Sequence, residues 1–419
     1  MATRRDFIGI LTAGVLASCA AVRADDKVLK PGLDDLQRWL EAGATFDQLP
    51  QQFLLDPKLS YFNTGSLGAS PRVVVEAHSA FLRAIEANPA GLLFGSMGDQ
   101  MEVVRKKAAD FIGADLDEVT LTANTTSGMN MVAEALALRA GDEVLTTDQE
   151  HAGGRIGWEY ARAQRGIVIR EVSLPMPSRS IDEVITAIKA AMTERTRVIC
   201  LSHVNTITGL RMPLTAVAKL AAGSGAYLVV DGAQAPGMLQ VNLRELGCDA
   251  YATSCHKWML GPKGSGLLYL RKEFQKQVPS ISLYSGMGSY TAASGTRNVP
   301  QILSLGVALD FQNTVGQQRI EARDLALSRH LRKQLSTIPG VEIVSPAAPE
   351  LQSAIVTLKL PSGTSDAVAA ELFKKGIVVK VVPGEHLQNR GIRVSAHLYN
   401  TEREFDRLTS ELKHIVARV

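Results

Sequence analysis

The chain has 419 residues, of which 46% are hydrophobic and 21% charged, and its formal net charge is +3. This composition supplies enough apolar material for a large core and differs from that of disordered chains, which combine low hydrophobicity with high net charge. Because basic residues are scattered among acidic ones and form no block, we exclude a nucleic-acid partner. Beyond the N-terminus, no stretch approaches the ~20 apolar residues that a membrane-spanning helix requires.

The first 24 residues have the layout of a secretory signal, in which a basic segment precedes an apolar run and then small residues. The pair Arg4-Arg5, followed by Phe and Ile, resembles a twin-arginine (Tat) signal, which exports folded proteins. Small residues before Asp25 favour cleavage there, whereas Leu16-Ala-Ser-Cys19 resembles a bacterial lipobox in which Cys19 is lipidated. We therefore expect a periplasmic protein, either soluble or anchored by a lipid at Cys19.

Residues 25–60 are predicted to form an N-terminal arm and helical segment, followed by a large domain over residues 61–300. Helices are expected over 71–88 and 99–112, where apolar residues recur every three or four positions. Short buried strands then follow, most of them separated by helix-length segments: 119–123, 143–147, 167–174, 197–204, 226–230, 249–253 and 265–270. This alternation predicts an α/β fold with a mainly parallel, doubly wound sheet covered on both faces.

The pattern changes after residue 300, which predicts a smaller α+β C-terminal domain over residues 301–419. One long helix, over 301–338, is expected to link the two domains. Further strands are expected over 341–344, 354–360, 377–382 and 392–395, with helices over 365–375 and 402–418.

Two of the predicted strands end in residues that suit one cofactor. Asp231 ends the strand over 226–230, and Lys257 lies just beyond the strand over 249–253. Ligands of open α/β sheets bind beyond the carboxyl ends of strands, so both side chains can face one site. A carboxylate can keep a pyridine nitrogen protonated and a lysine can form a Schiff base, which are the two requirements of pyridoxal 5'-phosphate (PLP) as an electron sink. An aspartate after a strand is often only a helix cap and a lysine is usually solvated, but together they predict PLP on Lys257.

The motifs around these residues resemble fold-type I PLP enzymes of the class V aminotransferase family. They are Asp231-Gly-Ala-Gln234, Ser254-Cys-His256-Lys257-Trp and Gly261-Pro-Lys-Gly264. The resemblance extends from Tyr61-Phe-Asn-Thr-Gly65 to Arg393-Val-Ser-Ala-His-Leu-Tyr-Asn-Thr401 and is strongest to the isopenicillin N epimerase-like branch. It implies a PLP enzyme acting at the α-carbon of an amino acid or of a peptide-borne amino group, with Lys257, Asp231 and His151 as its catalytic residues.

The resemblance also implies a phosphate site. Thr125, Thr126 and Ser127 would hold the phosphate at a helix N-terminus, where backbone N–H groups and the helix dipole favour an anion. Ser254 and His256 would complete that site. The segment around Thr296 matches the one through which a second subunit contacts the phosphate, so a homodimer with the cofactor near the subunit interface is implied.

The remaining assignments concern the ring and the substrate. His151 would stack on the pyridine ring, and Gln234 would bond its phenolic oxygen with help from Asn205 or Thr206, which the sequence does not distinguish. Arg393 matches the family arginine that holds the substrate α-carboxylate, a task that suits the paired donors of a guanidinium. No Cys/His cluster has metal-ligand spacing, so no metal is expected.

The outcome of the reaction stays open. A cysteine desulfurase needs a nucleophilic cysteine shortly before the carboxylate-binding arginine, and residues 381–391 contain none, so that activity is rejected. Epimerisation, transamination and elimination by a C–S lyase of the cystine or sulfoxide type remain. An epimerase needs a second acid/base, for which Tyr284, Tyr290, His386 and His397 are candidates. Export favours a peptide substrate, since an exported enzyme resembling this family tailors the siderophore pyoverdine. A non-catalytic module with the same fold is the remote alternative.

Overall fold

The computed structural model describes residues 26–360, 364–383 and 390–418, so the signal-like segment 1–24 with Arg4, Arg5 and Cys19 lies outside the described residues. His386, a candidate second acid/base, also lies outside them. Within these three ranges, no helix is both long and apolar enough to cross a lipid bilayer.

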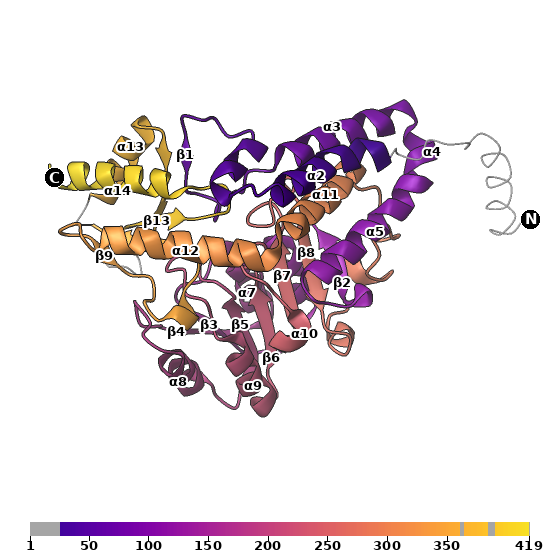
Figure 1. The fold of residues 1–419 in the computed structure, drawn as a ribbon. Helices are drawn as coiled ribbons and strands as arrows, with labels where there is room; N and C mark the ends of the chain where they lie inside the picture. Colours follow the sequence, from indigo (N-terminus) through magenta and orange to yellow (C-terminus); the bar gives the residue numbers. More distant parts are fainter. Residues whose placement is uncertain (1–25, 361–363, 384–389, 419) are drawn as a thin grey trace, which may run out of the picture.

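A seven-stranded sheet forms the centre of the large domain (Figure 1), with the strand order β2-β8-β7-β6-β5-β3-β4. The strands are β2 (Val119–Thr122), β3 (Glu143–Thr147), β4 (Val168–Val172), β5 (Thr196–Ser202), β6 (Tyr227–Asp231), β7 (Ala250–Ser254) and β8 (Gly266–Leu270). Neighbours from β7 to β4 run parallel, whereas β8 runs antiparallel to both β7 and β2. The predicted mainly parallel α/β sheet is thus confirmed. The connection from β7 to β8 carries Lys257 and is shorter than a parallel crossover requires.

Helices cover both faces of this sheet and bury its strands, apart from the partly exposed edge strand β4. In β5, Val198 and Cys200 join one apolar cluster, while Ile199 and Leu201 join another, as alternate residues of a strand must. The first cluster also holds helices α6 (Thr125–Ala135) and α7 (Ala152–Arg165). The second holds α8 (Ile181–Ala191), α9 (Leu214–Ser224) and α10 (Leu243–Leu246).

A layer of N-terminal helices lies beside the sheet, at the top of Figure 1. These helices are α2 (Asp26–Glu41), α3 (Arg72–Ala87), α4 (Pro89–Leu93) and α5 (Ser96–Phe111). Three of them, α2, α3 and α5, pack around α11 (Val299–Val315), while α4 packs against α3 and α5. Short 3-10 helices lie elsewhere along the chain: η1 (Phe46–Gln52), η2 (Leu116–Glu118), η3 (Gln275–Gln277), η4 (Ile281–Leu283) and η5 (Pro349–Leu351).

The prediction of one linking helix over 301–338 is wrong. The helix ends at Val315, and α12 (Gln317–Leu335) begins after Gly316, whose φ is 96° and ψ 115°. Glycine alone adopts such a conformation without strain, so the chain changes direction there. In Figure 1, α12 then runs across the molecule towards the C-terminal elements.

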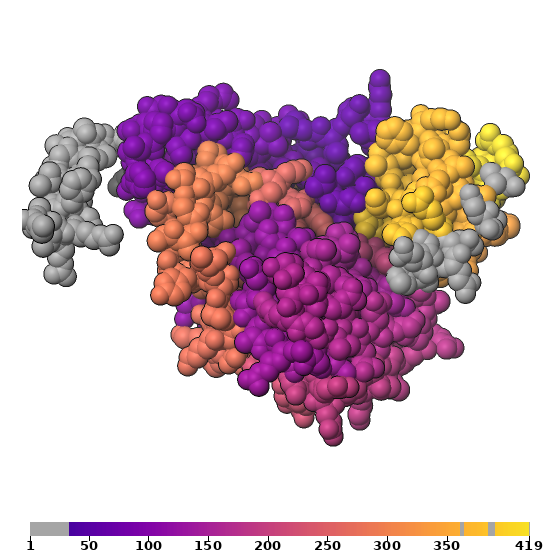
Figure 2. Space-filling view, turned by 180° about the vertical axis from the view of Figure 1, so that it is seen from behind, coloured from indigo at the N-terminus to yellow at the C-terminus, as the bar shows by residue number. Residues whose placement is uncertain are grey.

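The C-terminal domain contains an antiparallel sheet of order β12-β13-β10-β9. Its elements are β9 (Glu342–Ile343), β10 (Ile355–Lys359), β12 (Lys380–Val382) and β13 (Gly391–Ser395), with helices α13 (Ser365–Lys374) and α14 (Glu402–Val416). The strand expected over 377–382 is divided, because β11 (Ile377–Val378) pairs with β1 (Ser60–Tyr61) instead. Early and late parts of the chain therefore lie side by side, as Figure 2 shows in indigo and yellow.

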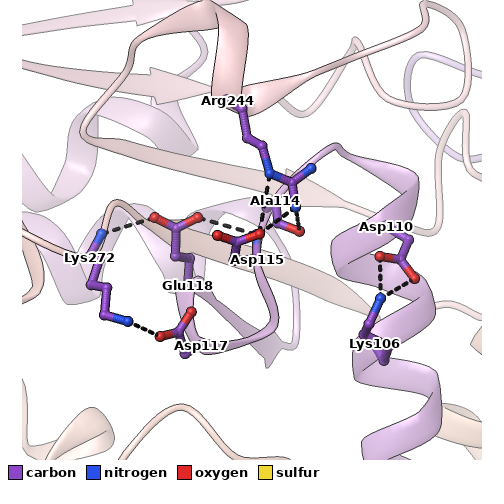
Figure 3. A network of polar contacts seen from close by, with 8 residues as sticks. All are labelled: Lys106, Asp110, Ala114, Asp115, Asp117, Glu118, Arg244 and Lys272. Atoms are coloured by element: carbon purple, nitrogen blue, oxygen red, sulfur yellow. Dashed lines mark hydrogen bonds and ion pairs between the residues drawn. The ribbon is translucent and has the colours of Figure 1, made fainter.

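A polar network fastens the chain just before β2 (Figure 3). Glu118 accepts hydrogen bonds from the backbone N–H groups of Lys272 (3.0 Å) and Asp115 (3.2 Å). Arg244 donates to Asp115 and to the carbonyl of Ala114, at 2.5 and 2.7 Å. These contacts join the start of β2 to α10 and to the end of β8.

Candidate active site

The predicted site residues gather at the carboxyl ends of the parallel strands. Asp231 is the last residue of β6 and Ser254 the last of β7, while α6 and α7 begin just after β2 and β3. Ligand sites of open α/β sheets occupy this edge because strand ends and helix N-termini converge there.

The N-terminus of α6 forms an anion-binding loop. Asn124 caps the helix by accepting a hydrogen bond from Ser127 N at 2.9 Å. Thr125 joins the loop to β7, because its N–H donates to Ser254 Oγ at 3.0 Å and its hydroxyl lies 2.8 Å from the same atom. Thr126 belongs to the same first turn and lies against α7. The two are so close that a Cβ added at Gly153 of α7 would lie 2.4 Å from Oγ1 of Thr126. Helix N-termini of this kind favour phosphate groups.

His256 adds a further observation in favour of a phosphorylated ligand. Its Nδ1 is buried, yet it has no hydrogen-bond partner among the described residues. Burial, followed by the charge of Lys257, lowers the pKa of His256. A buried polar atom without a partner is costly, and a ligand that bonds it removes the cost. This orphaned nitrogen, two residues after the Ser254 that bonds Thr125 of α6, fits the phosphate of PLP.

Lys257 follows directly and faces two charged groups. Burial lowers the pKa of its amine to about 8, while the charge of Asp231 raises this pKa and that of Arg393 lowers it. Asp231 is 6% exposed, and its Oδ1 accepts a hydrogen bond from Ala233 N at 2.9 Å. A Cβ at position 154 would lie 2.7 Å from Asp231 Oδ2, so α7 approaches this carboxylate closely through Gly154. A lysine whose pKa is lowered towards neutrality and a fixed carboxylate fit the aldehyde and ring nitrogen of PLP.

Glu150, the residue before His151, lies near Asp231. Its carboxylate accepts hydrogen bonds from Thr147 Oγ1 at 2.7 Å and from Ser202, whose Cα pairs with that of Asp231 across β5 and β6. Burial, with a contribution from the charge of Asp231, raises the pKa of Glu150 to about 7. The sequence does not show that Glu150 lies near Asp231, because this contact depends on the pairing of strands that are distant along the chain.

His151 begins α7 at the opening of the site. The residue is partly exposed, and its Nδ1 accepts a hydrogen bond from Gly153 N at 3.0 Å. Partial burial of the ring, followed by the charge of Lys257, lowers the pKa of His151. The ring is therefore favoured in its uncharged form, which suits stacking on an aromatic cofactor.

Arg393, on β13 of the C-terminal domain, reaches across to the large domain. It is 4% exposed, and its Nη1 donates to Thr206 Oγ1 (2.7 Å) and to the Thr206 carbonyl (3.1 Å). Its Nη2 donates to Ser66 Oγ at 3.0 Å and to Asn63 Oδ1 at 3.2 Å, while its Nε is buried without a partner. Burial lowers the pKa of Arg393 to about 10. Over the three described ranges no carboxylate pairs with it, although a buried charge normally has a counter-ion.

Thr206, rather than Asn205, contacts Gln234. Gln234 Nε2 donates to Gly65 O at 2.8 Å and lies 3.3 Å from Thr206 Oγ1, and its Oε1 accepts from the Trp258 indole at 2.7 Å. Asn205 is fully buried and turned away, since its amide donates to Gln149 O and accepts from the backbone of Ile207 and Thr208. Asn205 thus shapes the turn that presents Thr206.

Other predicted residues lie outside this group. Thr296 is exposed at the surface, in a segment held by Arg297, which donates to Leu121 O at 2.9 Å. Tyr284 and Tyr290 are also at the surface, 90% and 47% exposed. His397 is fully buried, with Nδ1 2.7 Å from Asp324 Oδ2 and Nε2 3.0 Å from the Trp258 carbonyl. Both of its ring nitrogens are engaged within the core, so it does not face the site.

The family model of aminotransferase class V matches residues 61–408. An isopenicillin N epimerase from Amycolatopsis lactamdurans is 34% identical over 387 residues, which cover 87% of this chain and 97% of the relative. A cysteine desulfurase from Salmonella agona (strain SL483) is 29% identical, over 85% of this chain and 93% of its own. Among solved structures, a mutant of the cystine C–S lyase C-DES with glycine covalently linked to its PLP cofactor has a TM-score of 0.78 and 24% identity, covering 87% of this chain and 98% of its own. The fold-type I architecture expected from the sequence is thus confirmed.

Proposed function

Since the chain belongs to the class V aminotransferase family and uses PLP, we propose that it acts at the α-carbon of an amino acid, either free or borne on a peptide with its α-amino and α-carboxyl groups free. The single observation that supports this most strongly is Arg393, a buried cation beside Lys257 without a carboxylate partner in the described part of the chain. A substrate α-carboxylate would supply the missing counter-ion. One carboxylate oxygen can bond the unpartnered Nε–H, and the other would replace a protein oxygen at an outer nitrogen, since the outer N–H groups already donate to Thr206, Ser66 and Asn63.

The residues divide the work of such a reaction. When bound, PLP supplies the electron sink that stabilises negative charge on the substrate α-carbon. Asp231 keeps a proton on the ring nitrogen, and Arg393 orients the substrate by its carboxylate. Lys257 moves the proton at the α-carbon, for which its lowered pKa of about 8 keeps a useful fraction uncharged near neutrality. His151 covers the opening of the site and limits access of water.

We propose epimerisation as the outcome, supported by the relative from A. lactamdurans, which is named an isopenicillin N epimerase. The alternatives are elimination by a C–S lyase and transamination. The described cysteines speak against a cysteine desulfurase. Cys200, Cys248 and Cys255 are buried, and burial raises the pKa of each thiol, that of Cys248 to about 12. None of the three is therefore a ready thiolate nucleophile.

The test is to incubate the holoenzyme with a panel of amino acids and short peptides in deuterated water. Incorporation of deuterium at the α-carbon with inversion supports epimerisation, whereas sulfide, ammonia or a keto acid would identify one of the alternatives. Lys257→Ala should abolish the yellow colour of the bound cofactor and all exchange. A wild-type protein that takes up no PLP, or that exchanges no α-proton on any panel member, would overturn the proposal in favour of a non-catalytic module.

A matched pair of ligands tests the role of Arg393. Alanine and 2-aminopropane differ only in the carboxylate, so Arg393→Gln should weaken alanine binding by about tenfold or more and leave 2-aminopropane unchanged. Equal effects on both ligands would show that the arginine supports the fold rather than the substrate. The titration follows the absorbance of the holoenzyme.

We also propose that the enzyme is exported to the periplasm by the Tat route, with its cofactor already bound, and that its substrate there is a peptide such as a siderophore precursor. The support is the Arg4-Arg5 signal pattern. Replacing both arginines by lysine should retain the protein in the cytoplasm. Cys19→Ser should leave a cleaved, soluble protein unchanged but release a lipid-anchored one from the membrane. Exchange on free amino acids, without any on peptides that carry an amino acid through its side chain with free α-amino and α-carboxyl groups, would contradict the peptide substrate.

A further inference from the structure

Lys380 lies next to Arg393 on the C-terminal sheet. The two residues are directly opposite each other in the antiparallel pair of β12 and β13. Side chains of opposite residues in such a pair project from the same face, with Cβ atoms about 5 Å apart. Lys380 therefore shares a sheet face with the arginine proposed to hold the α-carboxylate.

That face is turned towards the active site. Arg393 also pairs with Thr357 on its other side, in β10. Thr357 contacts the large domain by donating to Ile207 O at 2.5 Å, and Arg393 does so through the neighbouring Thr206. The row Lys380–Arg393–Thr357 thus faces the loop after β5, with Lys380 at the outer edge.

Lys380 is also within electrostatic reach of His151. Its positive charge, after those of Lys257 and Arg393, contributes to lowering the pKa of His151. The lysine is exposed, and among residues 26–360, 364–383 and 390–418 no carboxylate forms an ion pair with it. A second cation, exposed and without a carboxylate partner among these residues, thus stands beside Arg393 on the same sheet face.

We propose that Lys380 is a specificity-determining residue, which binds a second carboxylate on the side chain or peptide extension of the substrate. This inference rests on the proposed function, in which Arg393 holds the α-carboxylate. With that group fixed and the α-carbon at Lys257, the rest of the substrate passes His151 towards Lys380. A dicarboxylic amino acid, or an acidic peptide, would then bind in preference to a neutral one of the same length.

Matched probes measure this preference directly. L-α-Aminoadipate and L-norleucine have six-carbon chains and differ in the terminal carboxylate, and L-glutamate and L-glutamine form a shorter pair. Dissociation constants are obtained by titrating the holoenzyme and following its absorbance. We expect wild type to bind the acidic member of at least one pair about fivefold more tightly, as for a partly exposed ion pair. The preference should decrease between low salt and ~0.5 M salt, because exposed charges are screened.

The variant Lys380→Met keeps the length of the side chain and removes its charge, so it should abolish the preference without changing the affinity for the neutral probe. Lys380→Arg should retain it, and Lys413→Met, at an exposed lysine of α14, serves as the control. If the ratio of the dissociation constants of the neutral and acidic probes is unchanged in Lys380→Met, or if wild type has no preference for the acidic probe, the inference is wrong while the proposed function stands. If no probe changes the cofactor absorbance in any variant, both the inference and the proposed function are wrong.

Discussion

Lys257 must be an uncharged amine to bond the cofactor aldehyde, and its surroundings favour that form. With its pKa at about 8, about 10% of the amine is uncharged at pH 7, some hundreds of times more than for a solvated lysine. The rate of PLP uptake by the apoprotein should therefore rise about tenfold from pH 6 to 7 and level off above pH 8–9. Stopped-flow absorbance measures this rate. A profile that keeps rising towards pH 10.5 would show that burial does not depress this pKa.

Residues such as Lys257 and Asp231 were identified from sequence because each follows a strand, and parallel strands bring their carboxyl ends together. Asn205 and Thr206 could not be separated, because neighbours on one loop differ only in the direction of their side chains. His397 was a candidate acid because it belongs to a motif near Arg393, but its burial depends on Asp324 of the distant helix α12. Contacts between residues that are far apart along the chain cannot be predicted from the local sequence pattern.

At the scale of elements, α12 is joined to the Lys257 loop through one buried pair. His397 bridges the Asp324 carboxylate and the Trp258 carbonyl, and both side chains of the pair are 0% exposed. Burial raises the pKa of Asp324 to about 6, and the contact with His397 opposes that rise. Asp324→Asn should cost about 3 kcal/mol of folding free energy, because it breaks a buried pair.

The neighbouring ion pair on the same helix provides the control for this prediction. Arg323 pairs at 2.6 Å with Asp47, whose side chain is 68% exposed. Asp47→Asn should cost less than about 1 kcal/mol, since exposed ion pairs contribute little. Urea denaturation measures both variants. Equal losses of unfolding free energy in Asp324→Asn and Asp47→Asn would mean that the buried pair does not stabilise the Lys257 loop.

Gly316 is the element-scale feature that the sequence did not reveal. A single glycine in a helical pattern lowers helix stability by only about 1 kcal/mol, so the pattern favoured one helix across it. Its φ of 96° predicts that Gly316→Ala lowers stability by about 1–3 kcal/mol. Gly223 in α9, where a Cβ would meet nothing within 4 Å, is the matched control. Gly223→Ala should leave the guanidinium midpoint unchanged or raise it, and a similar fall in both variants would contradict the argument.

At the scale of the whole molecule, the site is assembled from distant parts of the chain. Strand β1 (Ser60–Tyr61) pairs with β11, and Arg393 from the C-terminal domain contacts both Ser66 and Thr206. The alternation of strands and helices was enough to predict the α/β sheet, because that rhythm repeats locally. It could not predict that β1 joins the C-terminal domain, since a two-residue strand has no detectable period.

The segment around Thr296 leads to the prediction that two chains complete each site. Thr296 is exposed, and Arg297 holds its segment at the protein surface. If Thr296 of one chain serves the phosphate site of the other, the purified protein is a homodimer of 45.0 kDa chains. The Lys257→Ala protein should then fail to retain PLP covalently, and the Thr296→Glu protein should fail to bind it at normal affinity. After the two are unfolded and refolded together, about a quarter of the sites should recover, because each mixed dimer holds one site with both native residues. Sedimentation and covalently retained PLP are the two measurements. No recovery in mixed dimers would show that Thr296 acts within its own chain or not at all.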